Sequence, residues 1–391
     1  MESVSRKDLL KSVKRVVVKV GSGVLTEAAG LNLTIIDELA TSICAVEKKK
    51  GIEVILVSSG AIASGLKKIG FSKRPQAVSQ QQAMAAAGQS SLMMAYEEAF
   101  GRHGKKVAQI LLTRDDLNHR RRYLNARNTI FTLLSWDVIP VINENDTVVV
   151  DEIKFGDNDN LSAMVTNMTE AHLLVNLTNI DGFFDKDPRT HKDARLIRTV
   201  EKVNRKILRS AGTIPGFLGT GGMASKIMAA KKVALGGVPT VIANGLSPGI
   251  LKRIFSGEDE GTLFQAQHTT LCSRKHWIVF TKSPKGALVV DRGAEMAILE
   301  HGKSLLPSGI MDVNGKFSIG DSVLLKNESG REFAAGMANY DAADIKRIAG
   351  KRTSEIESIL GFKYDDEVIH RDNLVLTEQL EEGDDACRFQ V

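Results

Sequence analysis

The sequence predicts an α/β fold, a three-layer αβα sandwich, followed by a small, mainly β domain. Between residues 15 and 255, short apolar runs alternate with segments of helical periodicity, and runs this apolar are typical of buried parallel strands. Beyond residue 274 the pattern changes to short alternating stretches separated by glycine and proline, which favours β structure. A length of 391 residues is more than one core normally supports, so two domains are expected.

Each apolar run of the first domain gives one expected strand. The six strands are expected at residues 15–20, 53–58, 107–112, 138–143, 172–178 and 239–244. Between the first two, Ile35, Leu39, Ile43 and Val46 recur at helical spacing, and Thr34 is the expected N-cap of that helix. Helices of this kind would cover both faces of the sheet.

The domain boundaries follow from changes in composition. We expect the first domain at 13–257, a polar linker at 258–274, the second domain at 275–355 and an acidic tail at 370–391. The tail is poorly patterned, which disfavours a packed structure there.

Composition argues against several function classes. Lys and Arg number 52 against 47 Asp and Glu, so the chain lacks the strong basic excess that nucleic-acid binding favours. Cys44, Cys272 and Cys387 are far apart and lack metal-ligand spacing, which is typical of a reducing compartment. The N-terminal sequence MESVSRKDLLKSVKR lacks the apolar stretch of a signal peptide, and no apolar run approaches the length of a membrane span. We therefore expect a cytoplasmic protein without a membrane partner.

Gly21, Ser22 and Gly23 follow the first strand directly, at the edge where parallel sheets open a ligand crevice. The segment is neither a Walker nor a Rossmann glycine motif, because Thr26 stands where a third glycine would; a tight strand–helix turn is the alternative. Lys19 lies inside the apolar strand, and a buried lysine is costly without an anionic partner. It therefore indicates a phosphate or carboxylate, with an edge-strand lysine that reaches water as the alternative.

Two further segments could bind anions through backbone N–H groups. Small residues from Ser58 to Gly65 follow the second strand, and they let N–H groups at a helix start approach an anion; close helix–sheet packing is the alternative. Glycines from Gly216 to Gly222 precede Lys226 and a helix, a pattern able to hold a triphosphate; a linker is the alternative.

Polar residues are densest in two short segments, NEND at 143–146 and GDNDN at 156–160, which flank an expected hairpin at 147–155. Asp157 or Asn158 could cap the helix that follows. A cap explains only one or two of these side chains, so a binding site is the functional interpretation. A surface turn is the alternative.

Taken in order, these segments resemble the amino acid kinase family, most of all its members that phosphorylate L-glutamate. The resemblance covers residues 13–255 and rests on VVVKVGSGVLT, LVSSGAIASG, VINENDTVV, FGDNDNLSA, LTNIDGFFDKDPR and GTGGMASK. Residues 276–352 resemble the PUA domain through LPSGI, GKFSIGDSV and GMANYDAADI. The combination is specific, although each motif alone is modest.

The resemblance implies transfer of the ATP γ-phosphate to the side-chain carboxylate of L-glutamate, giving L-glutamyl 5-phosphate in the first step of proline biosynthesis. ATP and Mg²⁺ would be the cofactors and proline a feedback inhibitor. We also expect a homo-oligomer, a dimer or tetramer. The stretch 115–127, rich in Arg and Asn, is a candidate for the inhibition or for subunit contacts.

The resemblance also implies roles for individual residues. Lys19 and Lys226 would contact the transferring phosphoryl group, with Asp159 holding both lysines in position. The substrate-binding residues would be Ser59, Gly60, Ala61, Asn143, Asp146 and Asn158. The ATP-binding residues would be Lys19, Gly21, Ser22, Gly23, Thr178, Asn179, Thr220, Gly221, Gly222, Met223, Ala224, Ser225 and Lys226. Mg²⁺ would be held through the nucleotide phosphates, near Asp157.

Asn179 departs from the family pattern, which usually has Asp after the Leu-Thr pair. The change is harmless if this position meets the nucleotide through its backbone, and it weakens binding if a carboxylate is required. No general base is expected, because a glutamate side chain with a pKa of about 4.3 is already ionised at neutral pH. Phosphoryl transfer then depends on positioning and on neutralising charge, so Asp159 would organise Lys19 and Lys226 rather than accept a proton.

Two alternative functions stay open at this point. Another kinase of the family, acting on aspartate, acetylglutamate, carbamate or a nucleoside monophosphate, would reuse the glycine segments and lysines with a different substrate cluster. RNA binding by the PUA-like domain is disfavoured, because its basic residues are scattered among acids rather than gathered. These residues are Lys282, Lys285, Arg292, Lys303, Lys316, Lys326 and Arg331.

Overall fold

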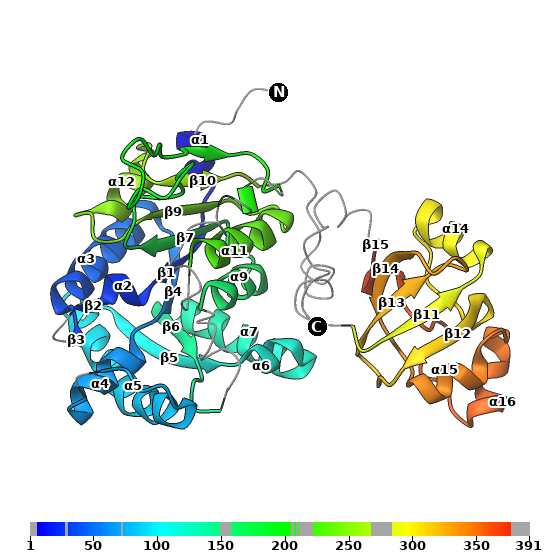
Figure 1. Cartoon of the computed structure of the whole chain (residues 1–391). Helices are drawn as coiled ribbons and strands as arrows, with labels where there is room; N and C mark the ends of the chain where they lie inside the picture. The colour runs from blue at the N-terminus through cyan, green and yellow to red at the C-terminus, as the bar shows by residue number, and fades with distance from the viewer. Residues whose placement is uncertain are drawn as a thin grey trace. The chain divides into compact units, whose positions relative to one another are not determined.

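The structure is a computed structural model that describes residues 6–27, 30–71, 73–148, 158–204, 207–208, 210, 222–266 and 284–376. The chain divides into two compact units, residues 1–270 and 271–391, and each is described by itself (Figure 1).

The first unit is built on a sheet of eight strands in the order β5-β6-β4-β1-β7-β9-β10-β8. In chain order the strands are β1 (Arg15–Val20), β4 (Glu53–Ser58), β5 (Lys106–Leu112), β6 (Val138–Glu144), β7 (Leu173–Thr178), β8 (Thr199–Val200), β9 (Thr240–Asn244) and β10 (Thr262–Phe264). Neighbouring strands are parallel except β9 and β10. The six strands predicted from apolar runs are confirmed to within one residue at each end.

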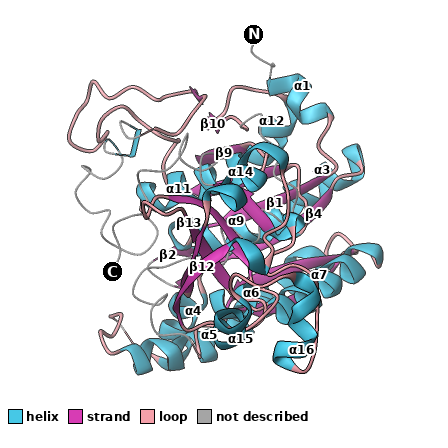
Figure 2. Ribbon diagram, turned by 90° about the vertical axis from the view of Figure 1, so that its right-hand side faces the viewer, coloured by secondary structure: helices cyan, strands magenta, loops and turns pink. Residues whose placement is uncertain are grey.

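Helices cover both faces of this sheet, as predicted. They are α1 (Arg6–Lys11), α2 (Ser22–Leu25), α3 (Leu33–Lys50), α4 (Ala61–Ile69), α5 (Val78–Gly101), α6 (Arg114–Asn118), α7 (Arg120–Ser135), α9 (Asn158–Met168), α11 (Met223–Leu235) and α12 (Ile250–Ser256). A short ribbon of β2 (Thr26–Glu27) and β3 (Gly30–Leu31) precedes α3. In Figure 1, α3 lies on one side of β1, β4 and β7, and α9 and α11 lie on the other. Helix α1 packs beside α12 (Figure 2).

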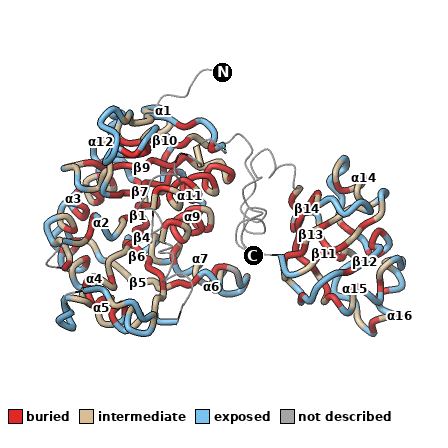
Figure 3. Tube along the Cα trace, viewed as in Figure 1, coloured by how far each residue is buried: buried red, intermediate tan, exposed pale blue. Residues whose placement is uncertain are grey.

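The alternation of side chains along β1 decides where Lys19 points. Successive residues of a strand face opposite sides of the sheet. Val16, Val18 and Val20 belong to the apolar core that includes α3, whereas Val17 belongs to the core that includes α9 and α11. Lys19 therefore points toward α9, from a strand that lies in the buried centre of the unit (Figure 3).

Helix α3 is capped by a different residue from the one predicted. Its N-cap is Asn32, whose side chain accepts a hydrogen bond from the N–H of Ile35 at 3.1 Å. The prediction of Thr34 is wrong, because Asn32 already provides the extended backbone and the acceptor oxygen that a cap requires, and Thr34 lies inside the helix. The predicted apolar stripe of this helix does pack into the core.

Helices α4 and α5 approach each other through two glycines. A Cβ at Gly65 would lie 1.8 Å from the carbonyl oxygen of Met84, and a Cβ at Gly88 would lie 1.9 Å from that of Ala61. Both distances are far shorter than any non-bonded contact, so a side chain would force the two helix backbones apart. Part of the small-residue segment after β4 thus serves helix–helix packing, rather than the helix–sheet packing that the sequence suggested.

The second unit has its own five-stranded sheet in the order β12-β11-β13-β14-β15. Its strands are β11 (Gly286–Val290), β12 (Ile310–Gly315), β13 (Ser322–Lys326), β14 (Glu332–Met337) and β15 (Leu374–Leu376). Its helices are α14 (Arg292–His301), α15 (Ala342–Ile348) and α16 (Ile356–Leu360), with 3₁₀ turns η1 (Pro307–Gly309), η2 (Thr353–Glu355) and η3 (Arg371–Asn373). Leu288, Val323 and Tyr340 lie in its separate apolar core, which agrees with the predicted small, mainly β domain.

Several elements lie outside the expected domain boundaries, among them α1 before residue 13 and η3 beyond residue 370. Strand β10 falls in the expected linker 258–274. It belongs to the sheet of the first unit, because its backbone pairs with β9 and β8. Helix α16 and strand β15 lie beyond residue 355, and β15 pairs with β14 inside the expected tail 370–391. Most of the expected hairpin at 147–155 lies outside the described residues. Within the described ranges, no helix combines the length and apolar character needed to cross a bilayer.

Candidate active site

Two lysines from distant parts of the first unit meet one buried aspartate. Lys19 lies in β1, Asp159 at the start of α9 and Lys226 near the start of α11. The Nζ of Lys19 lies 2.5 Å from Oδ1 of Asp159, and the Nζ of Lys226 lies 3.1 Å from Oδ2. All three side chains are buried, Asp159 completely. The three residues that the resemblance assigns to catalysis therefore form one cluster with a positive charge in excess.

Asp159 accepts two further hydrogen bonds, so its carboxylate is surrounded by donors. Nδ2 of Asn176 donates to Oδ1 at 3.1 Å, and Oγ of Ser225 donates to Oδ2 at 2.6 Å. Burial alone would raise the pKa of Asp159, but the charges of Lys19 and Lys226 and the hydrogen bonds from Lys19 and Ser225 hold that pKa well below its usual range. The carboxylate is thus ionised at neutral pH, where it can hold donors but cannot accept a proton.

Lys226 sits at a helix start that favours anions. Burial lowers its pKa, and the charge of Lys19 lowers it further, whereas Asp159 raises it. Gly222, the N-cap of α11, has no side chain to bond the first N–H groups of the helix, and a helix N-terminus attracts phosphate. The predicted ATP-site residues Met223 and Ala224 lie in this first turn.

A second polar cluster lies beside the first, at the ends of β4 and β6. Nδ2 of Asn158 donates to the carbonyl oxygen of Ser58 at 3.0 Å, to Oγ of Ser59 at 2.9 Å and to Oδ1 of Asn143 at 3.0 Å. Asn158 and Asp159 are neighbours at the start of α9. This helix end therefore belongs to both clusters and holds them side by side.

The remaining predicted substrate residues lie around this second cluster. Gly60 caps α4 with a φ of 106°, a left-handed conformation that favours glycine. Ala61 begins α4 and is buried. Asp146 is half-buried in the turn after β6.

Helix α5 contributes two side chains that the sequence analysis missed. Oε1 of Gln89 accepts a hydrogen bond from Nδ2 of Asn143 at 2.8 Å. The hydroxyl of Tyr96 forms a 2.8 Å hydrogen bond with Oγ of Ser58. Tyr96 is completely buried, and burial raises the pKa of its hydroxyl above the usual range. The signal that could have found both residues is their spacing, since positions i and i+7 share one helix face.

The turn after β1 is a tight strand–helix turn, which was the alternative interpretation of this glycine segment. Gly21 is the N-cap of α2, Ser22 is the first residue of that helix, and the N–H of Gly21 donates to the carbonyl oxygen of Leu177 at 3.0 Å. Asn179 lies against Gly23, where a Cβ would approach its Nδ2 to 3.2 Å. The predicted ATP-site residues that follow β1 therefore lie next to Asn179, which follows β7.

Three predicted residues, Asp157, Thr220 and Gly221, lie outside the described residues. Thr178 ends β7 and is buried. Among the described residues, no three His, Cys, Asp or Glu side chains gather as a metal site, and Asp159 already accepts four hydrogen bonds. The described residues therefore provide no cluster of three such side chains that would hold a metal ion.

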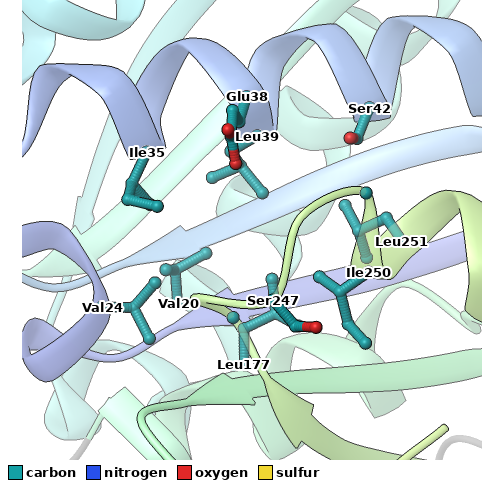
Figure 4. Close-up of a pocket in the computed structure, with 12 residues that line it drawn as sticks. Val20, Val24, Ile35, Glu38, Leu39, Ser42, Leu177, Ser247, Ile250 and Leu251 are labelled. Atoms are coloured by element: carbon teal, nitrogen blue, oxygen red, sulfur yellow. The ribbon is translucent and has the colours of Figure 1, made fainter.

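A small pocket lies on the α3 face of the sheet, opposite the charged cluster (Figure 4). Its volume of about 20 Å³ is enough for about one water molecule. It is therefore too small for an amino acid or a nucleotide. Its lining includes Val20, Ile35, Glu38, Leu39, Ser42, Leu177 and Ile250.

Comparisons with known proteins identify the family of the chain. The chain matches the model of the amino acid kinase family over residues 14–244 and that of the PUA domain over residues 286–360. Glutamate 5-kinase of Geobacter sulfurreducens is 54% identical over 95% of this chain and 100% of the relative. Glutamate 5-kinase of Geobacter metallireducens is 56% identical with the same coverage, and that of Syntrophotalea carbinolica is 52% identical over 95% of this chain and 99% of the relative. Because these matches span nearly the whole of both chains, the protein belongs to the amino acid kinase family and, within it, to the glutamate 5-kinase family.

Proposed function

We propose that the chain transfers the γ-phosphate of MgATP to the side-chain carboxylate of L-glutamate, forming L-glutamyl 5-phosphate and ADP in the first step of proline biosynthesis. Its relatives are named glutamate 5-kinase. One arrangement carries the proposal, the buried cluster of Lys19, Asp159 and Lys226 beside the amide cluster of Asn143 and Asn158. The first cluster suits a phosphoryl group and the second suits an amino acid.

The reaction needs charge neutralisation more than proton transfer. A γ-carboxylate oxygen of glutamate attacks the γ-phosphorus, and the bond from that phosphorus to the bridging oxygen of ADP breaks. The attacking carboxylate is ionised at neutral pH, so no proton has to move. The obstacle is repulsion between the carboxylate and the phosphate oxygens, and the ammonium groups of Lys19 and Lys226 would offset it.

Asp159 would act as the organiser of the two lysines. Its pKa is held well below the usual range by the nearby lysine charges, against the opposing effect of burial, so it is a poor base. Hydrogen bonds from Asn176 and Ser225 fix its carboxylate plane. This orientation directs one oxygen to each lysine.

The nucleotide would lie along the first strand end and the start of α11. The glycine turn from Gly21 to Gly23, the neighbouring Asn179 and the first turn of α11 are the described parts of this proposed site, and Mg²⁺ would be bound to the phosphates. The resemblance also supports feedback inhibition by proline, assembly as a homo-oligomer and a cytoplasmic location as further proposals.

Trapping of the product tests the function directly. The purified protein is incubated with MgATP, hydroxylamine and one acceptor at a time: glutamate, aspartate, acetylglutamate, carbamate or UMP. An acyl phosphate gives a coloured hydroxamate, and ADP release reports turnover of every acceptor. The proposal requires hydroxamate with glutamate as the strongly preferred acceptor. Equal use of aspartate, or ADP release with UMP alone, would contradict it.

A further inference from the structure

We infer that Gln89, on helix α5, is a substrate-binding residue whose Nε2 donates a hydrogen bond to the α-carboxylate of the amino acid. The inference rests on the proposed function and extends it to a helix that none of the recognised motifs includes. Three observations carry it: the orientation of the amide network, two buried polar atoms left over in that network, and the position of α5 beside the strand ends.

A backbone group fixes the orientation of the amides. The N–H of Glu144 donates to Oδ1 of Asn143 at 2.9 Å, so the other end of that side chain, Nδ2, must be a donor. Nδ2 of Asn143 donates to Oε1 of Gln89 at 2.8 Å, so the oxygen of Gln89 must face Asn143. The Nε2 group of Gln89 therefore points away from Asn143.

The same reasoning orients Asn158. Its Nδ2 donates to the carbonyl oxygen of Ser58 and to Oδ1 of Asn143, and both of these atoms are acceptors only. Its Oδ1 must therefore face the other way. The orientation of every amide in the cluster thus follows from backbone groups that cannot be reversed.

Two buried atoms of opposite character are left in this network. Nε2 of Gln89, a donor, and Oδ1 of Asn158, an acceptor, are both buried and have no hydrogen-bond partner within the described part of the chain. A buried polar atom without a partner is costly. An α-amino acid satisfies both atoms at once, because its carboxylate accepts from Gln89 and its ammonium donates to Asn158.

The order of the strands indicates which end of the amino-acid substrate lies near Gln89. Asn143 lies on β6, and Lys19 lies on β1, with β4 between them. Adjacent strands are about 4.8 Å apart, so the two strands lie roughly 10 Å apart. The γ-carboxylate has to approach the lysines at the β1 end for transfer. The α-carboxylate is then the group that faces the β6 end, where Gln89 lies.

Glycine packing holds α5 in this place. Gly88 touches the start of α4, since a Cβ there would lie 1.9 Å from the carbonyl oxygen of Ala61. Tyr96 lies on the same helix face as Gln89, two turns further on, and bonds Ser58 at the end of β4. Contacts of Gly88 and Tyr96 thus hold helix α5 beside the amide cluster on both sides of Gln89.

The test compares two substitutions with different consequences. Gln89→Glu keeps an oxygen that can accept from Asn143 but replaces the donor with a second oxygen, whereas Gln89→Met removes both groups at similar size. The proposal predicts a rise in the glutamate KM of about 10- to 100-fold for both variants, because a hydrogen bond to a charged group is lost. The rise should be larger for Gln89→Glu, since its carboxylate also repels the substrate carboxylate. The ATP KM should not change, and kcat should fall less than KM rises.

A matched control and an analogue separate binding from a structural role. Gln80→Glu makes the same change at an exposed position of α5 and should leave every constant unchanged. The inhibition constant of 4-aminobutanoate, which lacks the α-carboxylate, should be the same for the wild type and both Gln89 variants. A wild-type glutamate KM in folded, active Gln89→Glu protein would overturn the proposal, and so would an equal loss of affinity for 4-aminobutanoate. Absence of hydroxamate from the wild type would instead refute the proposed function.

Discussion

Asp159→Asn is the substitution whose cost the structure defines best. The new amide is almost the same size, but one of its two terminal atoms is now an NH₂ group that cannot accept a hydrogen bond. Either Lys19 and Asn176 or Lys226 and Ser225 then lose their acceptor. Both lysines stay buried without a carboxylate to balance them.

The expected loss of folding stability is large because the ion pairs of Asp159 with Lys19 and Lys226 are buried. Breaking a buried ion pair on one side costs about 3–5 kcal/mol of folding free energy. A domain of this size changes its melting temperature by roughly 2–4 °C per kcal/mol. The melting midpoint of the first unit should therefore fall by roughly 6–20 °C, and kcat should fall together with it because the lysines lose their positions.

Calorimetry and the hydroxamate assay measure these two effects. Asp137→Asn is the matched control, since Asp137 pairs with Lys105 at 2.5 Å but its side chain is 78% exposed. It should change the stability by less than about 1 kcal/mol. If Asp159→Asn melts at the wild-type temperature and keeps its kcat, the carboxylate does not organise the lysines, and the proposed mechanism is refuted.

The other predictions concern the second lysine, acid stability and helix packing. Lys226→Ala should lower kcat by about 10²–10³-fold with little change in the glutamate KM, so a near-normal kcat in steady-state assays would contradict its role. The folded pKa of Asp159 lies below its unfolded value of about 3.9, so the stabilisation by its carboxylate is present above that pH and is lost as the pH falls from there toward the folded pKa. In urea unfolding from pH 6 to pH 3, the free energy of unfolding should therefore fall more steeply for the wild type than for Asp159→Asn. Parallel curves would be evidence against this linkage. Gly65→Ala should destabilise by about 1–3 kcal/mol, because its Cβ would lie 1.8 Å from the carbonyl oxygen of Met84. Gly101→Ala in the same helix pair has no neighbour within 4 Å and should leave the thermal midpoint unchanged or slightly raise it.

The sequence by itself determined the strands of the first domain and the chemistry of the charged cluster. The run from Arg15 to Val20 is apolar except for Lys19, and burial of such a run predicts both a central strand and an anionic partner for its lysine. Residue type alone did not locate the N-cap of α3, because two nearby residues are suited to that position. Thr34 and Asn32 are both able to cap a helix, and only the backbone geometry selects Asn32.

Only the tertiary structure decided which residues from distant segments meet. No sequence motif pointed to Asn176, yet pairing of β7 with β1 places it opposite Lys19, where it donates a hydrogen bond to Asp159. Gln89 lies on a helix with no motif, and the approach of α5 to α4 through facing glycines brings it to the amide cluster. The physical reason is that a motif records the residues of one segment, whereas a hydrogen bond between segments depends on strand order and helix packing, which long-range burial sets.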